Sequence, residues 1–268
     1  MADIIRKPAV ADAFYPGDPD ELRKMVDGFI MDAKETKKEG VLRGLVVPHA
    51  GYIYSGPVAA YGYRLLSREQ KRFSKIMIIG PSHYAAFFGA AESGADAWQT
   101  PLGIVKSGSI RRMIGKTDLF QDIPQVHAPE HCLEVQLPFL QTVMKKDFTI
   151  FPFLTGEVSP SVLAETLVKM INDETLVIAS SDLSHYNPYE KAIRIDSICN
   201  KAVPALDIKT MEESGDACGK TAILTLMHIA KKKKWKGKLL DYRNSGDTAG
   251  PKDAVVGYGC YAFYSLRS

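Results

Sequence analysis

Three histidines each follow a short apolar run that has the composition of a buried β-strand. They are His49 after residues 45–47, His83 after residues 76–79, and His185 after residues 176–179. Small residues and turn-formers surround all three. Ligands in open α/β sheets bind beyond the carboxyl ends of the strands, where residues far apart in the chain meet. We therefore expect the three histidines to converge on one pocket.

The chemistry of these histidines indicates a metal site. Imidazole is the commonest metal-ligating side chain and the usual general base near neutral pH. With Asp182 close to His185 in the chain, the set suits iron, zinc, manganese or copper, because these ions accept mixed imidazole and carboxylate ligands. We predict His49, His83 and His185 as ligands of one divalent metal, and His185 and Asp182 as the catalytic residues. The competing interpretation is three ordinary loop histidines bonded to backbone.

A second polar cluster lies at residues 130–137. On a helix, His131 and Glu134 would share a face, and so would Glu130 and Glu134. The His-Glu-x-x-His order of a metalloprotease helix is absent. Two alternatives stay open: Glu130 and His131 support the pocket or contact substrate, or they are first-turn residues of a helix. His127 and His228 are assigned structural positions.

Tyrosines near the histidines are candidate ligand contacts. Two follow the first histidine, one follows the third, and one ends a late predicted strand. Aromatic side chains supply rigid contact area. The residues that we assign to substrate binding are Tyr52, Tyr54, Tyr186 and Tyr242, together with Glu134.

The four cysteines form no Cys-x-x-Cys pair, so the sequence indicates neither a disulfide framework nor a thiolate zinc knuckle. Cys218 stands at or just before the start of a predicted helix, where a lowered pKa would make it a nucleophile. The alternative is a small buried residue at a tight helix entry. The Gly-Lys-Thr after Cys218 lacks the first glycine and the preceding strand of a phosphate-binding loop.

The elements that must position these residues alternate between β and α. Predicted strands cover residues 44–47, 76–79, 148–153, 176–179, 239–242 and 255–263, and predicted helices cover 20–31, 57–67, 109–115, 133–144, 161–171, 188–206 and 222–232. Several strands are continuously apolar, as strands covered on both faces by helices tend to be. We predict one α/β domain over residues 1–268, with a central, largely parallel mixed sheet flanked by helices.

The composition and net charge limit the classes of binding partner that the sequence supports. The 268 residues carry 34 basic and 31 acidic side chains, a net charge of +3, which is too small a surplus to indicate nucleic acid or an anionic membrane. The lysine run at residues 231–234 is interpreted as a solvated helix end. No apolar stretch has the length of a membrane span or a signal-peptide core, so we expect a cytoplasmic protein. The expected ligand is a small molecule or a peptide, and a homo-oligomer is left open.

At these same residues the sequence resembles the Memo family, whose microbial members are called AmmeMemoRadiSam system protein B. The matching motifs include Pro-His-Ala-Gly-Tyr-Ile-Tyr-Ser-Gly at 48–56, Gly-Pro-Ser-His at 80–83, Glu-His-Cys-Leu-Glu-Val-Gln-Leu-Pro at 130–138 and Ser-Ser-Asp-Leu-Ser-His-Tyr at 180–186. Shorter matches follow at residues 218–219, 245–247 and 255–258, so the resemblance covers nearly the whole chain.

The resemblance implies a fold similar to that of the class III extradiol dioxygenases, which are non-heme-iron enzymes. It implies that His49, His83 and His185 occupy the pocket corresponding to their iron site, with Fe(II) expected first and zinc, manganese or copper as alternatives. A carboxylate ligand is left open among Asp182, Glu134 and Asp247. Microbial members accompany AMMECR-type and radical-SAM proteins. Eukaryotic members carry a pocket cysteine where this sequence has Tyr242, so a thiolate ligand there does not transfer.

Two functions from different classes follow. The first is a metal-dependent, dioxygenase-like oxidoreductase of unknown substrate. The second is a non-catalytic binding or adaptor protein that uses the same pocket for a peptide or a small anion. A third hypothesis is a hydrolase that uses Cys218 or a metal-activated water.

Overall fold

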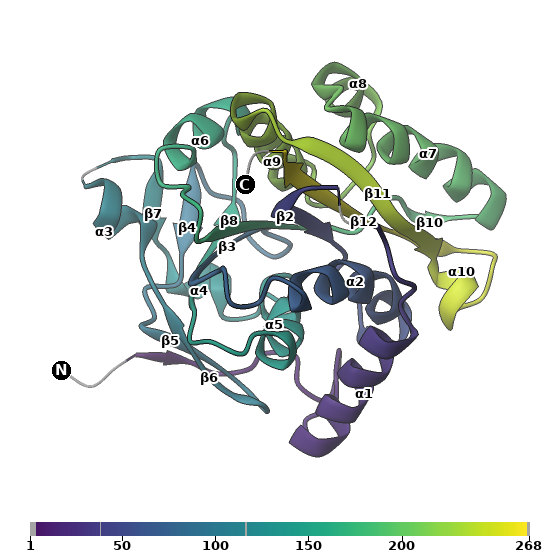
Figure 1. Cartoon of the computed structure of the whole chain (residues 1–268), viewed down its shortest axis with the longest axis horizontal. Coiled ribbons are helices and arrows are strands. Elements are labelled where there is room, and N and C mark those ends of the chain that lie inside the picture. The colour runs from purple at the N-terminus through teal and green to yellow at the C-terminus, as the bar shows by residue number, and fades with distance from the viewer. Residues whose placement is uncertain (1–3, 38, 116, 267–268) are drawn as a thin grey trace.

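The computed structural model describes residues 4–37, 39–115 and 117–266 (Figure 1). Its centre is a mixed sheet with the strand order β1-β5-β6-β8-β3-β9-β2-β12-β10, to which β11, β4 and β7 add at the sides. The strands are β1 (Ile5–Arg6), β2 (Val41–Val47), β3 (Lys75–Pro81), β4 (Ala90–Glu92), β5 (Ala97–Thr100), β6 (Gly103–Ser107), β7 (Phe120–Asp122), β8 (Thr149–Thr155), β9 (Thr175–Ser180), β10 (His185–Asn187), β11 (Lys236–Asn244) and β12 (Val255–Ser265).

The middle of the sheet is parallel. Strand β3 pairs in parallel with β8 on one side and β9 on the other, and β9 pairs in parallel with β2. Nearly every residue of β2, β3 and β9 is buried, which explains their continuously apolar sequences. Because these neighbouring strands run the same way, their carboxyl ends meet at one edge of the sheet.

Helices cover both faces of the sheet (Figure 1). They are α1 (Pro19–Asp32), α2 (Tyr52–Ser67), α3 (Ile110–Ile114), α4 (Pro124–His127), the 3-10 helix η1 (Glu134–Gln136), α5 (Leu137–Val143), α6 (Pro160–Leu167), α7 (Tyr189–Ala205), α8 (Ile208–Ser214), α9 (Lys220–Lys233) and α10 (Ser245–Thr248). One core cluster joins the sheet to α1, α2 and α5, and a second joins its other face to α6, α7, α8 and α9. The predicted α/β architecture with a largely parallel central sheet is confirmed. No described helix has both the length and the apolarity needed to cross a bilayer.

The element predictions hold for the long elements and fail in detail. All six predicted strands are present and all are longer than predicted, although β8 begins one residue later than predicted, whereas the short strands β1, β4–β7 and β10 were not predicted. Helix α2 begins at Tyr52 and not at Pro57, which lies inside it. Burial of most of α2 offsets the cost of the backbone hydrogen bond that this proline cannot donate. The predicted helix at 133–144 is η1 followed by α5.

An N-terminal segment, residues 5–15, is fastened across the fold to η1. Arg6 Nη1 pairs with Glu134 Oε2 at 2.5 Å, and the Arg6 guanidinium also donates to the backbone oxygens of His127 and Glu130. Glu134 accepts further hydrogen bonds from the backbone N–H groups of Ala9 and Val10 and from Tyr15 Oη. A fully buried carboxylate is satisfied in this way, and the segment that carries His131 is held against residues 5–15.

Candidate metal centre

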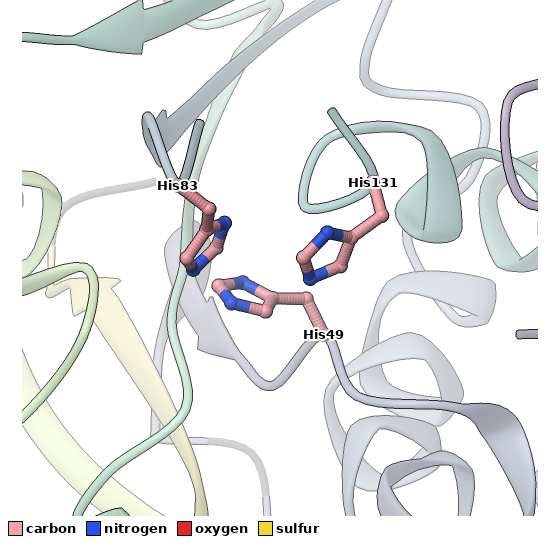
Figure 2. Close-up of side chains that lie close together, drawn as sticks. All are labelled: His49, His83 and His131. Carbon is pink, nitrogen blue, oxygen red and sulfur yellow. The ribbon is translucent and has the colours of Figure 1, made fainter. Parts of the chain in front are cut away.

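Three imidazole rings lie together at the carboxyl edge of the parallel strands (Figure 2). They belong to His49, His83 and His131, and each offers a ring nitrogen within 4.8 Å of the other two. The ring centroids of His83 and His131 are 4.7 Å apart in a stacked arrangement, and the His49 ring stands edge-on to both, at 5.2 Å and 5.3 Å. We call these three residues the histidine cluster.

The parallel strands place the first two members of the cluster. Strand β2 ends two residues before His49, and β3 ends two residues before His83. The backbone N–H of His49 donates to Asp182 Oδ1 at 2.7 Å, which ties this loop to the residues that follow β9. The third member, His131, comes from the irregular segment before η1, and the Phe14 ring packs against it at 4.6 Å.

Glu130 joins two of the histidines. Its Oε1 atom lies 2.9 Å from His83 Nδ1, and its Oε2 atom accepts the backbone N–H of His83 at 2.8 Å. The same carboxylate accepts the backbone N–H groups of His131 and Cys132. Burial opposes the ionisation of Glu130, but the hydrogen bonds and charge of His83 outweigh it and lower the pKa of Glu130 to about 2.

Burial keeps two members of the cluster, His49 and His131, uncharged. Desolvation, reinforced by the neighbouring His83, lowers the pKa of His49 to about 3. Desolvation and the neighbouring His49 lower the pKa of His131 to about 4. Both rings are therefore neutral at pH 7 and have lone pairs available, which is the state that a metal ion requires of imidazole.

A thiol completes the surroundings of His49. Cys218 stands two residues before α9, and its Sγ atom lies 3.2 Å from His49 Nε2. Burial, with the charge of Asp182 as the next contribution, raises the pKa of Cys218 to about 12. The thiol is protonated at neutral pH, which favours the interpretation of Cys218 as a small buried residue at a helix entry over that of a nucleophile with a lowered pKa.

Comparison with known proteins identifies the family of this chain. Residues 6–262 match the family described as Memo-like protein. The chain belongs to the Memo-like family. It is 36% identical to a MEMO1 family protein of Sulfolobus acidocaldarius, over 95% of this chain and 98% of the relative, and 34% identical to one of Ignicoccus hospitalis, over 97% and 99%. A MEMO1 family protein of Saccharolobus solfataricus is 35% identical over 94% and 97%. The resemblance seen in the motifs is thereby confirmed.

In this Memo-like protein His185 lies beside the cluster and not within it. Two groups of possible metal-ligating atoms occur among the described residues, one from His49, His83 and His131 and one from His83, Glu130 and Cys132, and neither contains His185. His185 begins β10, which pairs with β12 on the far side of β2 from β3 and His83. It is near enough for its charge to affect the pKa values of His49 and Asp182, and it is partly exposed. Its role in acting on a ligand stays a prediction.

Asp182 is buried, and its side chain is hydrogen-bonded to the backbone of the loop that carries His49. Its carboxylate accepts the backbone N–H of His49, and burial raises its pKa. Of the other two carboxylates considered as ligands, Glu134 is bonded to Arg6, Ala9, Val10 and Tyr15. Asp247 caps α10 through the backbone N–H of Asn244. Neither of these two belongs to the cluster.

The predicted substrate contacts divide by exposure. Tyr52 is buried and donates its hydroxyl to the Val135 backbone oxygen, and Glu134 is fully buried, so a ligand reaches neither side chain in this structure. Tyr242 donates to Asp196 at 2.8 Å and packs in the second core cluster. Tyr186 is 76% exposed directly after His185, and Tyr54 is partly buried. These last two stay candidates for ligand contact.

Sequence reasoning missed the place of His131 and of Cys218 in this Memo-like site. The adjacent Glu130 could have pointed to His131, because a carboxylate next to one histidine can hold the ring of another histidine in place. However, Glu130 and His131 fitted the first turn of a helix equally well. For Cys218 the sequence indicated only a position at a helix entry. Its contact with Asp182, just after the end of β9, is visible only in the three-dimensional structure.

Proposed function

We propose that this Memo-like protein binds one divalent transition metal between His49, His83 and His131 and performs oxidation–reduction chemistry on a small organic ligand. The observation that carries the proposal is the histidine cluster itself: three imidazoles from three separate segments face one another with ring nitrogens within 4.8 Å. Stacked and edge-on contacts between such rings contribute only about 0.5–1.5 kcal/mol each, whereas a cation bound among them would hold all three ring nitrogens.

The donor set fits such a metal. His131 Nδ1 is buried and makes no hydrogen bond to the described residues, although Glu130 Oε1 lies 3.2 Å from it. Orphaned buried nitrogens of this kind are uncommon in folded proteins, and His127 Nδ1, outside the cluster, is a second one among the described residues. Imidazole ligands suit iron, copper, zinc and nickel, and the thiol of Cys218 beside His49 is a candidate fourth donor. We propose Fe(II) first, on the resemblance to non-heme-iron dioxygenases, with zinc, manganese and copper as the alternatives.

Different residues of the chain would then have different roles in binding the metal and the ligand. A bound metal supplies Lewis-acid and redox chemistry to the ligand. His49 and His131 stay uncharged at neutral pH and so remain competent donors. Asp182 holds the His49 loop through the backbone, and the partly exposed His185 is the candidate to exchange a proton with the ligand.

Exposed aromatic and apolar residues at this end of the molecule favour a second candidate function. Tyr84 follows His83 and is 59% exposed, Tyr186 follows His185, and Ile53 is 55% exposed in the first turn of α2. Such side chains also suit a binding or adaptor protein that recognises a peptide or a small anion without turnover. Metal-dependent oxygen uptake with catechol-like and other small substrates supports the enzyme, and its absence supports the binding protein.

Metal analysis tests the proposal directly. Protein purified without chelator is analysed for iron, zinc, manganese and copper, and the metal-free protein is titrated with each ion under anaerobic conditions. We expect one equivalent in the wild-type protein and less than a tenth of that in His49→Ala and His83→Ala. His228→Ala is the matched control, because His228 lies on α9 outside the cluster. Undiminished metal in both cluster variants overturns the proposal.

A further inference from the structure

Ser180 determines which nitrogen of His49 carries the proton. Its Oγ atom lies 2.6 Å from the Cys132 backbone oxygen, 2.8 Å from Gln136 Nε2 and 3.0 Å from His49 Nδ1. A hydroxyl has one hydrogen to donate and two lone pairs to accept with. Because a carbonyl oxygen only accepts, the single hydroxyl hydrogen goes to Cys132.

The orientation of the Gln136 amide completes the assignment of donors and acceptors around Ser180 Oγ. Gln136 Nε2 also donates to the Pro48 backbone oxygen at 3.0 Å, and Tyr63 Oη donates to Gln136 Oε1 at 2.7 Å. The amide nitrogen therefore faces Ser180 and donates to it. Ser180 Oγ has one lone pair left for His49, so His49 must donate from Nδ1 and its Nε2 atom carries the free lone pair.

Glu130 imposes the same tautomer on His83. Three of its hydrogen-bonding partners are the backbone N–H groups of His83, His131 and Cys132, and the fourth is His83 Nδ1. An ionised carboxylate only accepts, so His83 Nδ1 carries the hydrogen. The other ring nitrogen, Nε2, is then the one that His83 presents to a ligand.

His127 and His131 provide the contrast. His127 Nε2 lies 2.8 Å from the Ala91 backbone oxygen and so must carry its hydrogen there, which is the opposite tautomer. Within the described residues His131 Nδ1 has no hydrogen-bond partner, so no such bond sets the tautomer of His131. Two of the three cluster rings are thus locked by hydrogen bonds, and the third is held by packing against Phe14.

We propose that Ser180 and Glu130 are positioning residues of the metal site: each takes the Nδ1–H of one histidine, so that His49 and His83 both present the Nε2 lone pair. The metal part of this inference rests on the proposed function, whereas the tautomers are a property of the metal-free protein. Partners that orient metal-ligating histidines in this way typically contribute about 10- to 100-fold to metal affinity.

The tautomers are measured first, by nitrogen-15 NMR of histidine side chains in the metal-free protein at pH 8. Loss of resonances in His49→Ala, His83→Ala and His127→Gln assigns the rings. We expect Nδ1–H for His49 and His83 and Nε2–H for His127, which serves as the internal reference. An Nε2–H tautomer at His49 or at His83 in the wild-type protein overturns the inference, and this measurement needs no folded variant of Ser180 or Glu130.

Variants then test the two positioning residues separately. We expect Ser180→Ala to convert His49 to a mixture of tautomers while His83 is unchanged, and Glu130→Gln to perturb His83 while His49 is unchanged. Each variant should weaken metal binding about 10- to 100-fold. Ser180→Thr keeps the hydroxyl and should restore both readouts. Thr175→Val is the matched control, since it removes another buried hydroxyl from β9 at the opposite end of the strand.

The outcomes separate this inference from the proposed function. If Ser180→Ala folds and leaves both the His49 nitrogens and the metal affinity unchanged, Ser180 is not a positioning residue. If the wild-type tautomers are as expected but no metal binds, the hydrogen-bond assignment is supported and the metal proposal is overturned.

Discussion

Cys218 Sγ lies 3.2 Å from His49 Nε2, although 169 residues separate the two in the chain. The contact joins the start of α9 to the loop after β2, and the backbone N–H of Asp182 reaches the same sulfur at 3.3 Å. Since burial keeps this thiol protonated, it can donate to His49 in the metal-free protein. A thiol in this state is a poor nucleophile, which weakens the hypothesis of a cysteine hydrolase.

The reactivity of Cys218 follows from its pKa of about 12. Iodoacetamide at pH 7.5 should modify it at least about tenfold more slowly than it modifies glutathione, because alkylation requires the thiolate. Mass spectrometry of the metal-free protein over time measures the rate, and Cys218→Ser separates it from the three buried cysteines. Modification as fast as that of glutathione would contradict the burial-raised pKa.

Gly219 should not accept a side chain. A Cβ atom there would lie 2.6 Å from the Ser180 backbone oxygen and 2.7 Å from Ser181 Cβ. Gly219→Ala should lower the free energy of unfolding by about 1–3 kcal/mol, as overpacking typically does. Gly28→Ala in α1 meets nothing within 4 Å and should raise it by about 0.5–1 kcal/mol. Urea denaturation measures both, and an equal effect of the two changes would show that the contact at Gly219 relaxes freely.

Arg6→Met should destabilise the fold by removing the partner of a buried charge. Breaking such a pair from one side costs about 3–5 kcal/mol, because Glu134 would remain buried without its guanidinium. Arg112→Met is the control: Arg112 is 75% exposed and lies 3.8 Å from Asp96, so its loss should cost less than about 1 kcal/mol. Calorimetry and urea denaturation report the difference. Similar losses in the two variants would argue against a fastening role for Arg6.

His127 should make the stability of the metal-free protein depend on pH. Burial lowers its pKa from 6.5 to about 4 in the folded state, so the unfolded chain binds more protons between these values. Its stabilising contribution is complete above pH 6.5 and is lost as the pH falls toward 4.

The measurement for His127 is a difference, because buried carboxyls with raised pKa values, such as Asp196, act in the opposite sense at low pH. The stability advantage of the wild-type protein over His127→Gln should shrink between pH 7 and pH 4.5. A constant advantage over that range would mean that His127 is not buried as a neutral ring.

The sequence predicted the parts of the site that depend on strand ends. His49 and His83 follow β2 and β3, which are long, apolar and parallel to the β9 strand between them, so their convergence follows from topology. His185 looked equivalent, but β9 ends at Ser180 and the chain continues to β10 on the other side of β12. The position of a residue several places beyond a strand end depends on the course of the loop. The periodicity of the strand gives no information about that course.

The remaining parts depended on contacts that have no local pattern. His131 enters the cluster because Glu130 bonds to the His83 loop and because Arg6 holds the Glu130 carbonyl. The strands β4 and β7 have three residues each, too few for an alternation of polar and apolar side chains to identify them. Hydrogen bonds between distant segments determine both the position of His131 and the formation of β4 and β7. A single sequence does not show which distant residues are bonded to each other.

The fastening of the N-terminal segment bears on how the protein is made. Arg6 and its partner Glu134 are 128 residues apart, and β1 pairs with β5 at Ala97. During translation β1 must therefore stay unpaired at least until β5 has left the ribosome. Contacts of such long range slow folding, because chain closure precedes any gain from packing. β1 and Arg6 therefore pair late in folding, and the segment that carries His131 is held in place only after they do.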